Sequence, residues 1–190
     1  MRIVLVGQAP FGAKVLEGLL GKGEEVVAVY TPPDRGSRLD PLKEAALAGG
    51  IVIYQPATYK DDQVFAEYKE LKPELTILAF VTDIIPEKFF TEPSLGAICY
   101  HPSLLPLHRG ASAINWAIIA GRAKTGLTIF WGVAVDINHN HIQARPVYGA
   151  SATVQGKKRR MVANSSVRGF SQKFFRDNVS YKSQNCQLRF

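Results

Sequence analysis

Two kinds of apolar segment alternate along the first 131 residues, and this alternation most constrains the fold. Short runs rich in β-branched residues predict buried strands, and longer segments with apolar residues at helical spacing predict helices. The expected strands cover residues 3–6, 26–30, 51–54, 75–80, 95–100 and 126–131, and the expected helices cover residues 10–20, 41–48, 63–71 and 111–120. Such a chain predicts an α/β fold with three layers, in which a mostly parallel sheet carries helices on both faces.

The ends of the predicted strands indicate where a ligand would bind. Sheets of this kind bind their ligands beyond the carboxyl ends of the strands. Those ends fall at Gly7, Phe80, His101 and Trp131. We therefore expect the functional site to be built from the loops that follow these four residues.

The net charge of +7 is distributed unevenly along the chain. Residues 1–131 contain 13 Lys and Arg against 14 Asp and Glu, whereas residues 132–190 contain 10 against 2. The periodic pattern also ends near Trp131, so we expect an α/β core over residues 1–131 and an atypical basic segment with little order over residues 132–190. The cluster at residues 157–160 could contact RNA through its phosphates, or the segment could be a solvated tail.

The sequence favours a cytoplasmic protein. No apolar run approaches the length of a membrane-spanning helix, and the N-terminal residues read as a strand that is too short for a signal peptide. The two cysteines, Cys99 and Cys186, form neither a disulfide framework nor a metal-binding pattern. We expect both thiols to be reduced.

The first turn between a strand and a helix, at residues 7–12, resembles a phosphate-binding loop in its position only. It reads Gly-Gln-Ala-Pro-Phe-Gly, without the spacing of a dinucleotide fingerprint or the Gly-Lys-Ser/Thr ending of a nucleotide-binding loop. A tight structural turn is the favoured interpretation. The alternative is a role at the rim of an anion or cofactor site.

A histidine at the end of a predicted strand is the main candidate for catalysis. His101 precedes a loop that Pro102 and Pro106 restrain, and a histidine in this position is well placed for proton transfer near neutral pH. A satisfied histidine in a tight turn is the structural alternative. His108, on the same loop, is interpreted as solvated or structural.

The stretch over residues 101–116 carries a family resemblance. It reads His-Pro-Ser-Leu-Leu-Pro-Leu-His-Arg-Gly-Ala-Ser-Ala-Ile-Asn-Trp, and apart from one position this string is similar to the folate-dependent formyltransferase family. Residues 40–42, 85–86 and 128–131 are similar as well. The resemblance covers residues 1–131; it is greatest to the N-terminal hydrolase domain of 10-formyltetrahydrofolate dehydrogenase, and methionyl-tRNA formyltransferase is also related.

This resemblance implies a Rossmann-like, formyltransferase-type fold and an enzyme that hydrolyses or transfers the formyl group of 10-formyltetrahydrofolate. His101 matches the catalytic histidine, which donates to the formyl oxygen as that atom gains negative charge. The folate would be contacted by two loops, the pterin ring by Asp83, Ile84 and Ile85, and the region beside the formyl group by Ser103, Leu104, Leu105 and Pro106. Such chemistry implies neither a metal nor NAD bound by this domain, and the pair His139 and His141 lacks a third ligand.

Three positions depart from the family pattern. Many members have Asn where this chain has Cys99, a much weaker donor, and Arg where it has Leu107. The family's second catalytic residue is an Asp in a loop after the Phe-Trp strand, and the count from His101 places it at Ile137. Asp136 lies one residue early, and a shift of the loop would let it activate water or the acceptor amine, whereas a shift of the strand would turn it to the opposite face.

Three functional hypotheses follow. The leading one is a folate-dependent one-carbon enzyme with His101 and Asp136 as catalytic residues. The alternatives are a folate-binding domain without catalysis, because the family's carboxylate is displaced, and a protein related to methionyl-tRNA formyltransferase that contacts RNA through its basic tail. The formyl acceptor stays open between water, an aminoacylated tRNA and another amine.

Overall fold

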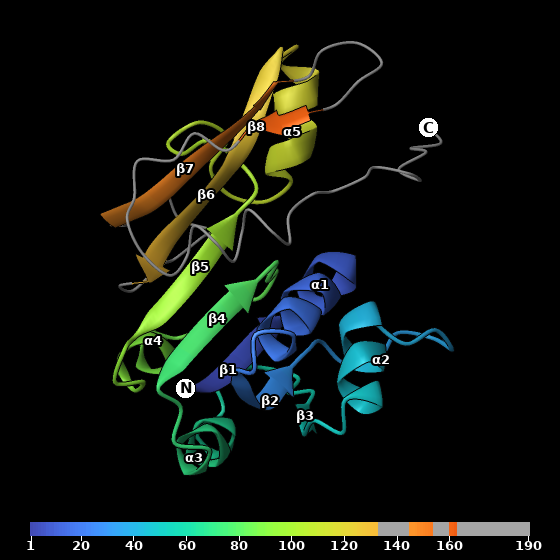
Figure 1. The fold of residues 1–190 in the computed structure, drawn as a ribbon, viewed down its shortest axis with the longest axis vertical. Helices are drawn as coiled ribbons and strands as arrows, with labels where there is room; N and C mark the ends of the chain where they lie inside the picture. The colour runs from blue at the N-terminus through green and yellow to red at the C-terminus, as the bar shows by residue number, and fades with distance from the viewer. Residues whose placement is uncertain (133–144, 154–159, 163–190) are drawn as a thin grey trace.

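The computed structural model describes residues 1–132, 145–153 and 160–162. The chain order is β1 (Arg2–Gly7), α1 (Ala9–Leu20), β2 (Glu25–Tyr30), α2 (Pro41–Ala48), β3 (Ile53–Tyr54), α3 (Asp62–Glu70), β4 (Leu75–Ala79), α4 (Lys88–Thr91), β5 (Ala97–His101), α5 (Ala113–Ile119), β6 (Lys124–Gly132), β7 (Arg145–Thr153) and β8 (Arg160–Val162). Within these residues the strands form one sheet in the order β3-β2-β1-β4-β5-β6-β7-β8 (Figure 1).

The sheet is parallel in its first part and antiparallel in its second. Strands β3, β2, β1, β4 and β5 pair in parallel, as crossover helices require. Strand β6 then runs antiparallel to β5, with Ala97 opposite Gly132 and His101 opposite Thr128. The prediction that Trp131 ends at the same edge as His101 is therefore wrong, because an antiparallel strand brings its beginning, and not its end, to that edge.

Two helices cover one face of the parallel strands. Ile3 and Leu5 of β1 point to this face and pack in a buried cluster with α1 and α2. Helix α2 lies close across the first turn of α1, since a Cβ atom added to Gly12 would come within 3.0 Å of the Leu42 side chain. The N-termini of the two helices are therefore held next to each other.

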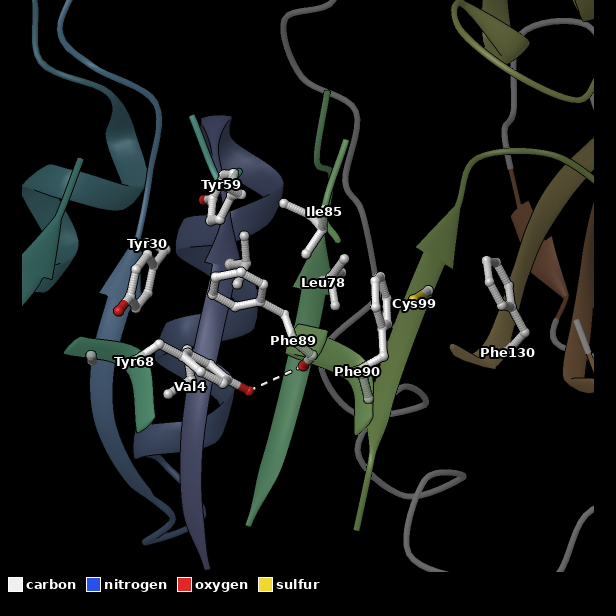
Figure 2. Close-up of a cluster of buried hydrophobic side chains, with 13 residues drawn as sticks. Val4, Tyr30, Tyr59, Tyr68, Leu78, Ile85, Phe89, Phe90, Cys99 and Phe130 are labelled. Atoms are coloured by element: carbon white, nitrogen blue, oxygen red, sulfur yellow. Dashed lines mark hydrogen bonds between the residues drawn. The ribbon is translucent and has the colours of Figure 1, made fainter. Parts of the chain in front are cut away.

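The opposite face is covered by α3, α4 and the segment between β3 and α3. Its core is aromatic: Tyr68 and Phe89 are buried, and their rings lie 4.7 Å apart (Figure 2). The Tyr68 hydroxyl donates to the Phe89 carbonyl at 3.1 Å and contacts the Thr76 hydroxyl at 2.7 Å. Cys99 belongs to the same cluster and is a free thiol, and burial raises its pKa to about 12.

The predicted fold class, a three-layer and mostly parallel α/β sheet with helices on both faces, is confirmed. Elements α4, β7 and β8 were not expected, because α4 has four residues and the sequence after Trp131 has little periodicity. The division between residues 1–131 and 132–190 stays a prediction, and within the described residues β7 continues the sheet beside β6. Among the described residues no helix is long and apolar enough to cross a membrane.

The start of α1 gives a test of local strain. Ala9 has φ +63°, a left-handed conformation in which the Cβ atom costs about 1 kcal/mol. We expect Ala9→Gly to raise the free energy of unfolding by about 0.5–1 kcal/mol, measured by urea denaturation. Ala13→Gly, in the interior of the same helix, should lower it by about 1 kcal/mol, and a loss of stability in Ala9→Gly would contradict the strain argument.

Candidate functional site

The loop that follows β5 is held to β6 by one hydroxyl group. Thr128 is buried; its hydroxyl donates to the Ser103 carbonyl at 2.7 Å and accepts from the Leu105 amide at 3.0 Å. The Ser103 side chain, itself fully buried, donates to the Leu107 carbonyl at 2.7 Å. The loop beside His101 is thus positioned by hydrogen bonds from an adjacent strand and from within itself.

His101 ends β5 and its side chain is buried, with 5% of the residue exposed. Its Nε2 atom lies 3.1 Å from the backbone carbonyl of His108. Because a carbonyl oxygen only accepts, Nε2 must carry the proton that it donates. The neutral ring therefore keeps Nδ1 unprotonated, and Nδ1 is the nitrogen that can take up or return a proton.

Burial lowers the pKa of His101, and the hydrogen bond to His108 raises it by less. Neither cause is a carboxylate, so no Asp or Glu within residues 1–132 supports the charged ring. A histidine ring that is buried and neutral near pH 7 can accept a proton, and a neighbouring anion would be needed to raise its pKa and keep the ring protonated. Within residues 1–132, His101 is thus a buried histidine whose pKa is not raised by any carboxylate.

The lowered pKa makes stability depend on pH. The unfolded chain binds this proton at about pH 6.5, whereas the folded chain binds it only at lower pH. The contribution of the neutral ring to the free energy of unfolding is therefore fully present above about pH 6.5, and it is lost as the pH drops from there to the folded pKa. We expect the unfolding free energy to decrease between pH 7.5 and pH 5.5, measured by urea denaturation, and to decrease less in His101→Asn. Equal pH slopes in the two proteins would contradict this prediction.

The loop after β4 places the three residues predicted to contact the pterin ring in different environments. Ile85 is buried in the aromatic cluster, Ile84 is 42% exposed, and Asp83 is exposed. Phe80, at the start of the loop, has φ +63°. The loop is thus anchored by Ile85 and turns residues 83 and 84 outward.

A small crevice opens between the loops after β1, β2 and β4, lined by residues 6–8, Pro32, Tyr59 and residues 80–83. The chain passes from one side of β1 to the other between β3 and β4, so this is the switch point at which such sheets bind ligands. Tyr59 stands at the carboxyl ends of the strands (Figure 2). Its pKa is raised by burial and by the Asp83 carboxylate.

Of the loop residues predicted to lie beside the formyl group, Ser103 is buried, Leu104 and Leu105 are half-buried, and Pro106 is exposed. They are brought to the same strand end as His101. Asp136 lies outside the described residues, as do His139 and His141. Within the described residues no group of three potential ligands could hold a metal ion.

A comparison with protein families identifies the family of this chain. The profile of the formyl transferase family, described as "Formyl transferase", matches residues 1–142. The chain belongs to this family. The resemblance expected from residues 101–116 is confirmed.

Curated members of the formyl transferase family match most of this chain. Cytosolic 10-formyltetrahydrofolate dehydrogenase of Homo sapiens is 42% identical over 136 residues, which are 69% of this chain and 15% of that protein. Methionyl-tRNA formyltransferase of Alkaliphilus oremlandii is 38% identical over 160 residues, 80% of this chain and 52% of that protein. The chain thus spans at most about half the length of these relatives.

Solved formyl transferase structures have the same fold. Phosphoribosylglycinamide formyltransferase from Bacillus halodurans matches with a TM-score of 0.66 at 18% identity, covering 83% of this chain and 82% of that chain. A formyltetrahydrofolate deformylase from Pseudomonas syringae matches with a TM-score of 0.64 at 18% identity, covering 83% and 52%. The Rossmann-like, formyltransferase-type fold is therefore confirmed.

Sequence reasoning missed Thr128 and Tyr59 as residues of this region. Thr128 lies within a predicted buried strand, and only its pairing with His101 shows that its hydroxyl faces the loop after His101. Tyr59 lies between two predicted elements, where no periodic signal exists. A polar residue inside an apolar strand was the one signal that could have identified Thr128.

Proposed function

We propose that this chain is a folate-dependent one-carbon enzyme domain that hydrolyses or transfers the formyl group of 10-formyltetrahydrofolate. The observation that carries the proposal is His101, buried at a strand end in a family-type loop, with the tautomer set by the His108 carbonyl. Membership of the formyl transferase family, and the names of relatives that act on formyltetrahydrofolate, support the substrate.

The proposed reaction requires a proton donor at the formyl oxygen. When a water or amine attacks the formyl carbon, that oxygen gains negative charge, and an N–H group directed at it stabilises the transition state. Nε2–H is engaged by His108, so the donor toward substrate is Nδ1 of the protonated ring. The attacking water or amine gives up a proton, and the folate nitrogen takes up a proton when its bond to the formyl carbon breaks and the carbonyl re-forms.

A second residue must favour the protonated ring. We propose Asp136 for this role, as the carboxylate that faces His101 and activates the nucleophile. The lowered pKa of His101 supports the need for such a group, because residues 1–132 supply none. The Asp136→Asn variant should lose turnover while retaining folate binding.

The folate would lie against two loops. We propose that the backbone of Asp83, Ile84 and Ile85 contacts the pterin ring, and that residues 103–106 lie beside the formyl group. We propose that the crevice lined by residues 6–8 and 80–83 lies on the acceptor side of the reaction. Folate chemistry of this kind requires neither a metal nor NAD in this domain.

The acceptor is proposed as water, a methionyl-tRNA or another amine. Relatives named for a dehydrogenase, a deformylase and a tRNA formyltransferase support different choices. A tRNA acceptor would use the basic segment over residues 132–190 for RNA contact. We also propose a cytoplasmic location; named relatives are cytosolic and mitochondrial.

The test is to incubate the protein with 10-formyltetrahydrofolate and measure tetrahydrofolate, with water alone and with methionyl-tRNA present. Tetrahydrofolate in water alone selects hydrolysis, and formation only with tRNA selects transfer. Folate binding without any product would select the alternative, a folate-binding domain that lacks a working carboxylate. Absence of folate binding would reject both.

A further inference from the structure

The first turn of α1 connects the crevice with the catalytic strand. Gln8 lines the crevice and donates to the Thr82 hydroxyl at 3.3 Å. Three residues later, the Phe11 ring stacks on Tyr100 with centroids 4.1 Å apart, and Tyr100 directly precedes His101. A group bound at the start of α1 would therefore border the acceptor side of the proposed reaction.

This helix start is already occupied by a carboxylate of the chain itself. Both oxygens of Asp40 accept from the Ala9 amide, at 2.9 and 3.0 Å. The same side chain accepts from the Leu42 amide at 2.8 Å and so caps α2. Asp40 thus stands at the positive ends of two helices, where an external anion would otherwise bind.

A second anion at the start of α1 would find few hydrogen-bond donors and no basic side chain among the residues that line the crevice. Pro10 has no amide hydrogen, so the amide next to Ala9 in the chain is missing. Among the residues that line the crevice, Asp83 is the one charged side chain, and it is acidic. A phosphate group placed beside Gln8 would meet two carboxylates and no Lys or Arg of the crevice.

Packing keeps Asp40 in place. The close contact between Gly12 and Leu42 fixes α2 against the first turn of α1. Moving the carboxylate away would remove the caps of both helices at once, and a cap of this type contributes about 0.5–2 kcal/mol to stability. The carboxylate is therefore a permanent part of the site.

We propose that Asp40 is a specificity-determining residue, a resident anion that excludes phosphate groups from the start of α1, so that the formyl acceptor carries no phosphate there. The acceptor class is then water or a neutral or cationic amine. This part of the inference rests on the proposed function. The exclusion of phosphate itself depends only on the contacts of Asp40.

The test measures phosphate binding to the full chain by NMR, following the Ala9 and Gln8 amide signals. The probes are inorganic phosphate and O-phosphoethanolamine, a small phosphorylated amine, at constant ionic strength. The wild type should show no saturable shift. In Asp40→Ser, which keeps a capping oxygen for α2 but removes the charge, we expect a saturable shift, with a Kd at least about tenfold below the highest phosphate concentration at which the wild type shows none.

Two further variants keep the result interpretable. Asp40→Asn retains the shape of the side chain, so its affinity for phosphate should increase less than that of Asp40→Ser. It replaces the serine variant in the test if that variant folds poorly. Asp61→Ser is the matched control, because Asp61 caps α3 in the same way, through the Gln63 amide at 2.9 Å, but contacts no other helix start. It should leave the Ala9 signal and its response to phosphate unchanged.

Two outcomes overturn the proposal. One is saturable phosphate binding at Ala9 in the wild type, and the other is that neither Asp40→Ser nor Asp40→Asn binds phosphate more tightly than the wild type. The readout uses neither folate nor turnover. A chain that fails to act on 10-formyltetrahydrofolate would therefore refute the proposed function and leave the exclusion of phosphate standing. A chain that acts on 10-formyltetrahydrofolate but binds phosphate at Ala9 would refute only the exclusion of phosphate.

Discussion

Replacing His101 by alanine is expected to reduce turnover of 10-formyltetrahydrofolate by at least about 10²–10³-fold. This is the usual loss when one preorganised donor to a developing oxyanion is removed. The effect should fall on kcat more than on KM, because the donor acts on charge that develops in the transition state. The measurement is steady-state production of tetrahydrofolate, with folate binding determined separately by calorimetry.

The matched control for this variant lies on the same loop. His108→Asn removes an imidazole while keeping the backbone carbonyl that accepts from His101, and Asn tolerates the left-handed backbone of that position, where φ is +51°. We expect near-normal kcat. Full activity of His101→Ala would refute the catalytic role of His101, and an equal loss in both variants would show that a general effect on the loop is responsible.

Replacing Thr128 by valine is expected to cost about 2–4 kcal/mol of unfolding free energy. The substitution keeps the shape but leaves the Ser103 carbonyl and the Leu105 amide without their partner, and each unsatisfied buried group costs about 1–3 kcal/mol. Because these two groups hold the loop beside His101, kcat should fall as well. Urea denaturation and the tetrahydrofolate assay measure the two effects.

Thr76→Val is the comparison for this variant. Thr76 is as buried as Thr128, but its partner is the Tyr68 hydroxyl, which still donates to the Phe89 carbonyl after the change. We expect a cost of about 1 kcal/mol and unchanged kcat, because Thr76 lies in the aromatic core away from the loop. If the two valine variants lose equal stability and equal activity, the anchoring role of Thr128 is refuted.

Two interactions of the catalytic loop have different consequences for chemistry. The bond from His101 to the His108 carbonyl selects the tautomer, whereas the bonds of Thr128 determine where the loop lies. The first should therefore govern the pH dependence of the reaction, and the second its rate at every pH. A pH profile of Thr128→Val that is lowered but not shifted would agree with this division.

We propose that Asp40 governs the acceptor side without a catalytic contact. Asp40 was part of a short string of family resemblance, and its position at two helix starts follows from the packing of α2 across α1. At the turn over residues 7–12, the Asp40 carboxylate of the chain itself lies at the start of α1. This explains why the turn has the place of a phosphate loop without the sequence of one.

The sequence by itself determined the order of the strands and of the longer helices within residues 1–131, because period and composition are local properties that burial imposes on each segment. It also identified the family, since the string over residues 101–116 is specific, and it singled out His101 as the residue to test. Only the tertiary structure decided that β6 is antiparallel, that Thr128 faces the catalytic loop, and that Asp40 closes the start of α1. These features depend on which segments pair and pack, and residues 31 positions apart, such as Ala9 and Asp40, have no periodic signal that connects them.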